Sequence, residues 1–340
     1  MFRNREMEVK RQLPARPFAL PPEMVFDGRA GTAQGKKGEG LMSTDPAEGQ
    51  APIGFIGLGV MGAPICHNIM TGSGRPMLVH DIGAERVQRL AEQGARPVAD
   101  PAALAAECGT LFLSLPGGPE VEAVLTGSGG IAASARPGLT IVDLSTTPVG
   151  LTRRLAAELA QKGVRFADAP VARTRAAAEA GTLSIMVGGT PDLFADLRPL
   201  LAHAASEVTH CGPVGCGQVA KIMNNMVLFQ TVVALSEALA LGEAAGMDRA
   251  LLFETLSKGS ADSFALRNHG MKAMIPDSFP VDAFPTDYAR KDISYALELA
   301  RDLGFEAPGA TLAEQRLAET SAAGFGREYF PVMARTVRRR

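Results

Sequence analysis

The chain has 340 residues, of which 46% are hydrophobic and 21% are charged, and its formal net charge is -2. This composition is typical of a globular protein, and the length suggests two domains. A near-neutral chain without tryptophan offers neither the basic field nor the stacking surface that favours nucleic acid or an anionic membrane. No uninterrupted apolar run reaches the roughly 18–20 residues of a membrane span. We therefore expect neither a nucleic-acid nor a membrane partner.

The four cysteines are Cys66, Cys108, Cys211 and Cys216, and no two of them form a C-x-x-C pair. His210 adds one further candidate ligand beside Cys211, but a structural zinc site needs about four ligands at compact spacing. The cysteines instead favour reduced thiols in a cytoplasmic protein. We expect no metal centre.

Residues 1–50 differ in composition from the rest of the chain. They mix proline, glycine, charged and small polar residues without sustained periodicity, and such a segment buries too little surface to offset chain entropy. Acidic residues argue against a transit peptide, and no long apolar stretch indicates a secretory signal. We expect a disordered extension, or a misassigned start with translation beginning at Met42.

A glycine-rich turn follows the first predicted strand, residues 52–56, and precedes a predicted helix, residues 63–70. The turn consists of Gly57, Leu58, Gly59, Val60, Met61 and Gly62. In this strand–turn–helix context, the glycines permit a tight turn, close approach of a pyrophosphate and close packing of helix on strand. The helix N-terminus adds free N–H groups for the phosphates. The turn therefore predicts a dinucleotide site.

Asp81 ends the second predicted strand, residues 77–80, about twenty residues after the turn. An acid at this position accepts hydrogen bonds from the adenosine ribose and repels a 2′-phosphate. Ile82 and Gly83 follow, with no arginine immediately after the acid. These residues favour NAD over NADP. The alternative is that Asp81 caps a helix starting near Ala84.

Further strands are predicted at 111–115 and 139–142, with helical patterns between them. Repeated strand–helix units indicate a parallel sheet covered by helices, with ligands beyond the carboxyl ends of its strands. Four residues at these ends are therefore expected near the cofactor: Leu115, Pro116, Ser145 and Thr146. For Ser145 and Thr146, a helix N-cap is the alternative.

The second half of the chain turns from strands to helices. Strands are predicted at 166–171 and 181–189, a long helix at 218–245, and helices onward to about residue 327. We predict an α/β Rossmann N-terminal domain over residues 51–212, followed by an all-α C-terminal domain over residues 213–340 for substrate binding and oligomerisation.

Five motifs in order resemble those of the β-hydroxyacid dehydrogenase family, which includes 3-hydroxyisobutyrate dehydrogenases and tartronate semialdehyde reductases. They are F-I-G-L-G-V-M-G at 55–62, D-A-P-V at 168–171, G-T-L-S-I-M-V-G-G at 181–189, A-K-I-M-N-N at 220–225 and K-D at 291–292. The resemblance spans about residues 52–330. It implies a Rossmann domain, a helical C-terminal domain, and dimers or tetramers.

The resemblance also implies that Lys221 is the catalytic acid/base. Lys221 lies on an otherwise apolar helix face, where desolvation would lower its pKa and suit it to proton transfer. Its alternative is a lysine that reaches solvent beside a helix start. Asn224 is expected to orient the substrate, with Asn225 in support. Lys291 resembles the family lysine that closes over the cofactor near the nicotinamide, and Asp292 is expected to position that segment.

The chain departs from its family after D-A-P-V, where Ser-Gly-Gly is usual and Ala172-Arg173-Thr174 stands instead. A guanidinium matches an oxyanion with a rigid fork of donors, and the Thr174 hydroxyl adds another. This pair is similar to the sulfolactaldehyde reductase branch, with relatives that handle succinic semialdehyde. Leu228 stands where that branch would have a small polar residue, so carboxylate and sulfonate substrates both remain open. Alternatively, Arg173 pairs with Glu179.

Together these features predict an NAD-dependent oxidoreductase that interconverts a small β-hydroxy acid and its semialdehyde, like a 3-hydroxyisobutyrate dehydrogenase. The first alternative is a sulfolactaldehyde or succinic semialdehyde reductase. The second is an imine reductase or a non-catalytic NAD-binding protein, and the intact lysines argue against both.

Overall fold

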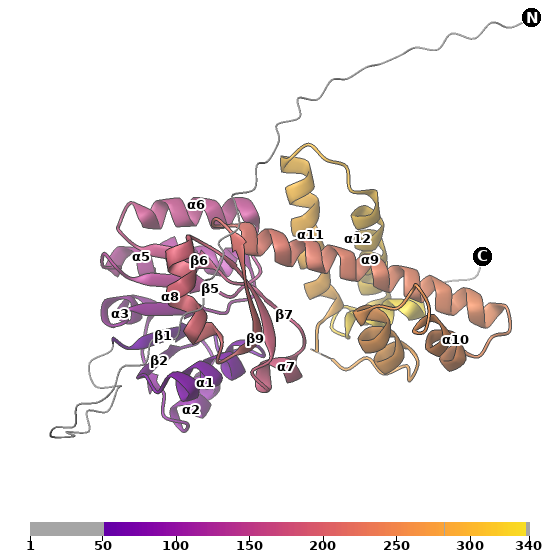
Figure 1. Ribbon diagram of the computed structural model, residues 1–340, viewed down its shortest axis with the longest axis horizontal. Coiled ribbons are helices and arrows are strands. Elements are labelled where there is room, and N and C mark those ends of the chain that lie inside the picture. Colours follow the sequence, from indigo (N-terminus) through magenta and orange to yellow (C-terminus); the bar gives the residue numbers. More distant parts are fainter. Residues whose placement is uncertain (1–50, 282, 338–340) are drawn as a thin grey trace, which may run out of the picture. The chain divides into compact units, whose positions relative to one another are not determined.

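The computed structural model describes residues 51–281 and 283–337. An α/β part comes first along the chain and a helical part follows it, which confirms the predicted fold class (Figure 1). The expectations about residues 1–50, and about a start at Met42, lie outside the described residues.

Among the described residues, the α/β part is built on a nine-stranded sheet with strand order β3-β2-β1-β4-β5-β6-β8-β7, and β9 pairs with β8. The first six strands in this order are parallel, whereas β8 runs antiparallel to β6 and β7. The strands are β1 Ile53–Ile56, β2 Met77–His80, β3 Arg96–Pro97, β4 Thr110–Leu113, β5 Thr140–Asp143, β6 Arg165–Asp168, β7 Val171–Ala172, β8 Leu183–Gly188 and β9 Ala205–Gly212.

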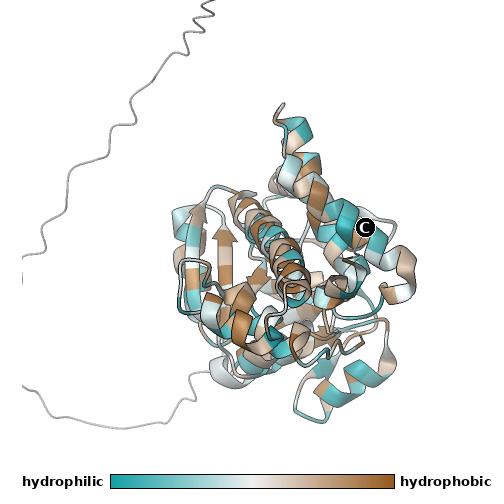
Figure 2. Cartoon of the chain, turned by 90° about the vertical axis from the view of Figure 1, so that its right-hand side faces the viewer, coloured by the Kyte–Doolittle hydropathy of each residue, from teal (hydrophilic) through white to brown (hydrophobic). Residues whose placement is uncertain are grey.

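Helices cover both faces of this sheet because successive strand residues point to opposite sides. On β4, Phe112 joins one apolar cluster, whose helices include α1 and α8, and Leu113 joins another, whose helices include α3 and α6. The strands carry mostly hydrophobic residues (Figure 2). The helices are α1 Gly62–Ser73, α2 Ala84–Ala91, α3 Pro101–Glu107, α4 Gly118–Thr126, α5 Ile131–Ser134, α6 Val149–Ala160, α7 Arg175–Glu179 and α8 Pro191–Leu201.

Two details of the sheet differ from the prediction. The expected strand at 166–171 is broken into β6 and β7, because Pro170 has no N–H to continue a ladder. β9 was not predicted at all: its sequence is mostly polar or small, and several of its residues are exposed.

The helical part begins with α9 Cys216–Ala244, which matches the predicted long helix. It is the one helix in the described residues long and apolar enough to cross a membrane. Its Phe229 lies 5.2 Å from Phe330 and 6.0 Å from Phe284, ring centre to ring centre, in a separate apolar core. The other helices are α10 Arg249–Leu256, a π-helical segment Leu266–Met274, α11 Thr286–Asp302, α12 Pro308–Thr320, a π-helical turn Ser321–Phe325 and a 3-10 segment Phe330–Thr336.

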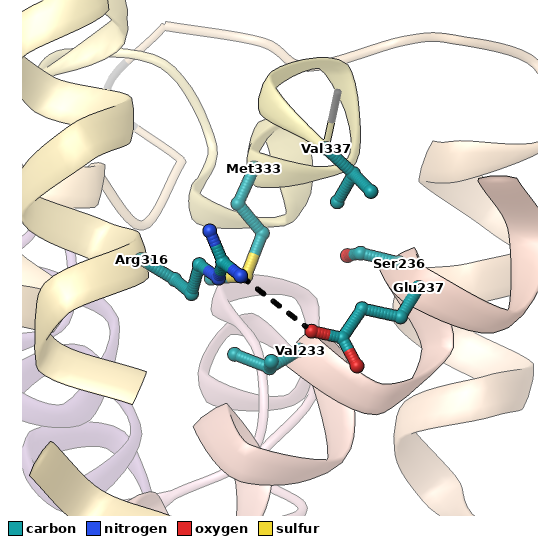
Figure 3. A pocket seen from close by; sticks show the side chains of 6 residues that line it. All are labelled: Val233, Ser236, Glu237, Arg316, Met333 and Val337. Atoms are coloured by element: carbon teal, nitrogen blue, oxygen red, sulfur yellow. Dashed lines mark ion pairs between the residues drawn. The ribbon is translucent and has the colours of Figure 1, made fainter. Parts of the chain in front are cut away.

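A small hollow lies in this helical core beside Arg316, whose guanidinium lies 3.9 Å from the Glu237 carboxylate (Figure 3). Its volume of about 10 Å³ is room for roughly one water molecule, which excludes it as a substrate site.

Candidate active site

Two glycines of the glycine-rich turn have no room for a side chain, whereas the third has open space beside it. Gly57 has a φ of +92°, and a Cβ there would lie 2.2 Å from the Ser114 carbonyl oxygen. A Cβ on Gly62 would lie 1.9 Å from the carbonyl oxygen of Gly57. Apart from its two chain neighbours, no described residue comes within 4 Å of the position where a Cβ on Gly59 would stand. Larger residues would therefore break the turn at its ends, while its middle is accessible to a ligand.

The N-terminus of α1 follows this opening directly. Met61 occupies the N-cap position, no side chain caps the helix, and its first turn contains no acidic residue. The Ala63 N–H already donates a 3.1 Å hydrogen bond to the Gly59 carbonyl, so an anion would meet the N–H groups that precede it, at the positive end of the helix. Val60 is 49% exposed beside them. This arrangement fits the pyrophosphate of a dinucleotide, which the turn and the helix N-terminus would hold together.

Asp81 is tied to the turn and does not cap α2. One carboxylate oxygen accepts a 2.6 Å hydrogen bond from the Leu58 N–H, and the other accepts a 2.6 Å bond from the Gly83 N–H. Gly83 is the N-cap residue of α2. Burial alone would raise the pKa of Asp81, but these hydrogen bonds and the nearby Arg86 hold it below its ordinary value. Asp81 is therefore a carboxylate at neutral pH.

Arg86 was missed in the sequence because it stands five residues beyond Asp81. Its Nη2 atom lies 2.8 Å from the Asp81 carboxylate, and its side chain is 39% exposed. A cation therefore neighbours the acid that is expected to read the adenosine ribose. The spacing is one turn into α2, where a sequence search for basic residues would have found it.

The loops after β4 and β5 are joined by a side chain. Ser145 is buried, and its hydroxyl accepts a 2.9 Å hydrogen bond from the Leu115 N–H. The next helix, α6, has Pro148 at its N-cap and no side-chain cap, so neither Ser145 nor Thr146 caps it. The structure thus brings Ser145 and Leu115 together at the carboxyl edge of the parallel strands.

Two buried aspartates lie under these loops, and sequence reasoning had not singled out either as a site residue. Burial raises the pKa of Asp143 to about 7, against hydrogen bonds from Ser145 and Thr147. Burial also raises the pKa of Asp168 to about 6, against backbone N–H donors that include Gly215 and Gln218. Asp168 is the acid of the D-A-P-V motif, and its two donors belong to the start of α9.

Lys221 lies in the second turn of α9 and is only partly accessible. Burial lowers the pKa of its amine; the Asp292 charge opposes that shift, and the Lys291 charge adds to it. Within the described part of the chain, the amine has no hydrogen-bond partner. It is therefore available to a bound molecule, and its role as the acid/base stays a prediction.

The two asparagines after Lys221 differ in their surroundings. Asn224 is exposed one turn along α9, and its amide donates a 3.0 Å hydrogen bond to the Asn225 side chain. Asn225 is buried and donates a 2.7 Å bond to Asp292 on α11. Asn225 therefore links α9 to α11 from inside, Asn224 stays exposed, and the orienting role of Asn224 remains a prediction.

Lys291 reaches from α11 to the loop after β4. Its amine donates a 2.7 Å hydrogen bond to the Pro116 carbonyl and lies 3.1 Å from the Asp292 carboxylate. It also stands 3.9 Å from the ring centre of Tyr288, whose hydroxyl donates a 2.7 Å bond to the same carbonyl. On the other side of Lys291, the Tyr295 hydroxyl accepts a 3.4 Å bond from the Gly118 N–H.

These tyrosines were not predicted as site residues. They stand three residues before and four residues after Lys291, which places all three side chains on one face of α11. That spacing was the available signal.

Arg173 and Thr174 lie apart from this cluster in the contacts they make. Arg173 is exposed, has a φ of +88°, and donates hydrogen bonds to the Thr182 carbonyl and, at 2.7 Å, to the Ser206 hydroxyl. The Thr174 hydroxyl caps α7 by accepting from the Ala177 N–H. Glu179 pairs with Arg175 at 2.8 Å. The alternative pairing of Arg173 with Glu179 is therefore not the one formed, and a role of Arg173 in substrate binding stays a prediction.

Comparisons with known proteins agree with this geometry. Residues 52–212 match the family model of the NAD-binding domain of 6-phosphogluconate dehydrogenase, and residues 215–337 match that for NAD-binding of NADP-dependent 3-hydroxyisobutyrate dehydrogenase. The chain is 34% identical to 2-(hydroxymethyl)glutarate dehydrogenase of Eubacterium barkeri over 81% of its length and 91% of the relative. It is 32% identical to human mitochondrial 3-hydroxyisobutyrate dehydrogenase over 83% of its length and 85% of the relative.

A solved structure shows the same likeness. The 3-hydroxyisobutyrate dehydrogenase of Mycobacterium tuberculosis, determined with L-serine, superposes with a TM-score of 0.78 at 30% identity, covering 85% of this chain and 100% of the other. The chain is therefore an oxidoreductase of the β-hydroxyacid dehydrogenase family, with an N-terminal NAD-binding domain.

Proposed function

We propose that this enzyme interconverts a small β-hydroxy acid and its semialdehyde with NAD, in the manner of a 3-hydroxyisobutyrate dehydrogenase. The observation that carries the proposal is Lys221. Its amine is desolvated, has no partner among the described residues, and neighbours the Lys291–Asp292 pair. A lowered pKa makes this amine a better proton donor and leaves more of it in the neutral, proton-accepting form than in an ordinary lysine.

In the oxidising direction, the neutral amine of Lys221 accepts the proton of the substrate hydroxyl. NAD, when bound at the turn, supplies the hydride acceptor. Asn224 orients the substrate from one turn away, and Asn225 fixes the helix through Asp292. In the reverse direction, the protonated Lys221 returns its proton to the carbonyl oxygen. The contribution of the protein is orientation and a matched proton donor or acceptor.

NAD is the proposed cofactor, with NADP used less well. The support is Asp81, a carboxylate at neutral pH that would repel a 2′-phosphate. Arg86 beside it moderates that repulsion, because its partly exposed guanidinium offers the phosphate a countercharge. We therefore expect a preference between the two cofactors rather than exclusion of NADP.

The substrate is proposed to be a small acidic molecule with a hydroxyl β to its acid group. The M. tuberculosis relative was solved with L-serine, which has that arrangement. The name of the E. barkeri relative describes a β-hydroxy acid with a second carboxylate. Arg173 favours a second acidic group here as well, because its exposed guanidinium uses only Nη1 in its two hydrogen bonds. A sulfonate or a succinic semialdehyde would serve the same contact.

We also propose a homodimer or homotetramer in the cytoplasm. Apolar side chains of the helical part remain exposed, including Val227 at 59% and Leu241 at 72% on α9. Such side chains are suited to contact with a second copy. Light scattering coupled to size exclusion tests the assembly, and cell fractionation tests the location.

The deciding experiment is a spectrophotometric screen at 340 nm with NAD and, in parallel, NADP. The substrates are 3-hydroxyisobutyrate, L-serine, 2-(hydroxymethyl)glutarate, 4-hydroxybutyrate, glycerate and threonate, with 3-sulfolactaldehyde in the reducing direction. Turnover of one β-hydroxy acid well above the others, with NAD preferred, is the expected result. No turnover of any of them with either cofactor would overturn the proposal.

A further inference from the structure

We propose that Gln218 is a positioning residue of the active site, which fixes the Lys221 turn of α9 to the loop after β5. The inference rests on the proposed function, because it assumes that Lys221 exchanges the proton. Gln218 would touch neither substrate nor cofactor. It would act through the two segments that it joins.

Three polar groups of Gln218 each bind a different partner outside α9. Its backbone N–H donates a 2.8 Å hydrogen bond to Asp168. Its side-chain oxygen accepts a 3.1 Å bond from the Thr147 N–H, and its side-chain nitrogen donates a 2.8 Å bond to the Ser145 carbonyl. The residue is 0% exposed. A buried side-chain amide that accepts one hydrogen bond on its oxygen and donates one from its nitrogen is held in a single orientation.

The loop after β5, to which Gln218 is hydrogen-bonded, is itself joined to the loop after β4 at the predicted cofactor site. Ser145 accepts a hydrogen bond on its hydroxyl from the Leu115 N–H, and on its carbonyl from Gln218. Hydrogen bonds therefore run from the loop after β4, through the loop after β5, to the side chain of Gln218. These loops stand at the carboxyl ends of the parallel strands, where a dinucleotide binds in such sheets.

Lys221 follows Gln218 by three residues, so both side chains lie on the same face of α9 about one turn apart. The start of the helix is also pressed against the sheet. A Cβ on Gly217 would lie 2.3 Å from the Met186 carbonyl oxygen, and Asp168 holds the N–H groups of Gly215 and Gln218. Any shift of Gln218 relative to the loop therefore moves Lys221 by a similar amount. The rates of proton and hydride transfer depend steeply on such shifts, and a misplacement of 1 Å lowers the rate by about 100-fold.

The chemistry of the position requires an amide. The loop presents one donor, the Thr147 N–H, and one acceptor, the Ser145 carbonyl. A carboxylate can accept from the Thr147 N–H but cannot donate to the Ser145 carbonyl. It would also add a negative charge beside the buried Asp168 and Asp143. A protonated carboxylic acid offers both an acceptor and an O–H donor, as an amide does. In Gln218→Glu, the charged glutamate therefore keeps only the hydrogen bond from the Thr147 N–H. The protonated form can make both hydrogen bonds.

The test compares Gln218→Met with Gln230→Met as the matched control. Methionine keeps the length and volume of glutamine and loses both hydrogen bonds. Gln230 lies on the same helix, but its amide donates only to its own helix, at Met226. With the preferred substrate and NAD, kcat of Gln218→Met should fall by about 10- to 100-fold. KM and the Kd of NADH, measured by its fluorescence, should change by less than about threefold, and Gln230→Met should retain wild-type kcat.

A second variant keeps the proposal testable if Gln218→Met does not fold, as judged by circular dichroism. The ratio of kcat for Gln218→Glu to wild-type kcat should rise as pH falls and the glutamate becomes protonated. A pH-independent ratio, or a kcat of Gln218→Met within twofold of wild type, would overturn the positioning role. Lys221→Ala is assayed alongside. Full turnover by that variant would overturn the proposed function itself, which separates the two failures.

Discussion

Asn225 on α9 donates a 2.7 Å hydrogen bond to Asp292 on α11, and the same carboxylate lies 3.1 Å from the amine of Lys291. The helix that carries Lys221 and the helix that carries Lys291 are thus joined by one buried acid. Asp292 also exerts its charge on Lys221, whose pKa it holds up against the effect of burial. Both lysines therefore depend on a side chain that neither cofactor nor substrate needs to touch.

Replacing the proposed acid/base tests the mechanism directly. Lys221→Ala should lower kcat by about 10²- to 10⁴-fold, the usual contribution of general acid–base catalysis. Lys272→Ala is the control, because Lys272 is exposed and donates only to Asn268. Both variants are assayed at 340 nm in the oxidising direction. A loss of less than threefold in the Lys221 variant would contradict the assignment.

The charge of Asp292 should be visible in the pH profile. Oxidation requires the neutral amine of Lys221, so kcat/KM should rise with pH through its lowered pKa, on the acid side of 10.5. Asp292→Asn removes the charge that raises this pKa while keeping an oxygen for Asn225. The rising limb should then move to lower pH. Asp302→Asn, at the far end of α11, should leave the limb in place. If kcat/KM of the Asp292 variant rises over the same pH range as in the wild type, Asp292 does not set the pKa of Lys221.

The substrate role of Arg173 can be separated from its backbone strain. Arg173→Ala and Arg173→Gly both remove the guanidinium, so both should raise KM for the true substrate at least about tenfold. Only glycine adopts the φ of +88° at no steric cost, so the glycine variant should be the more stable by about 1 kcal/mol.

Urea unfolding of the two Arg173 variants measures that difference in stability. Arg175→Ala is the control for KM, because Arg175 pairs with Glu179 on the same short helix. An unchanged KM in both Arg173 variants would remove the residue from the substrate site.

Cofactor preference should depend on Arg86. Arg86→Gln removes the countercharge beside Asp81, so KM for NADP should rise by about tenfold or more, whereas KM for NAD should change little. Arg89→Gln, an exposed residue later in α2, serves as the comparison. The two KM values are measured at a fixed substrate concentration. Equal effects on NAD and NADP would show that Arg86 does not read the ribose substituent.

His269 gives the helical part a pH-dependent stability that is unrelated to catalysis. It is buried against Tyr329, and burial lowers its pKa to about 4 from 6.5. Because the folded pKa lies below the unfolded value, its contribution to stability is complete above pH 6.5 and is lost as pH falls toward 4. Relative to His269→Phe, the wild type should lose about 3 kcal/mol of unfolding free energy across that range. Urea titrations from pH 4 to 7.5 measure it, and a constant difference would contradict the burial effect.

The local motifs of this protein were readable from sequence because their physics is local. The turn at 57–62, the strand before it and the long helix around Lys221 follow from spacing, glycine content and apolar periodicity. The links between Gln218 and Ser145, or between Tyr288 and Pro116, were not readable. They join residues 73 and 172 positions apart, and a lone polar residue on an apolar helix does not indicate its partner. β9 was missed for a related reason. Its sequence lacks the apolar alternation that marks a strand, and it is held in the sheet by its pairing with β8.

The carbonyl of Pro116 receives two donors from α11, the Tyr288 hydroxyl and the Lys291 amine. Any motion that separates this helix from the loop after β4 breaks both bonds in one event, at a cost of about 2–4 kcal/mol. A barrier of that size slows exchange by roughly 30- to 1000-fold compared with an untethered loop. The two bonds therefore tether α11 to the loop after β4, beside the proposed cofactor site. This tether would slow the release of a bound dinucleotide.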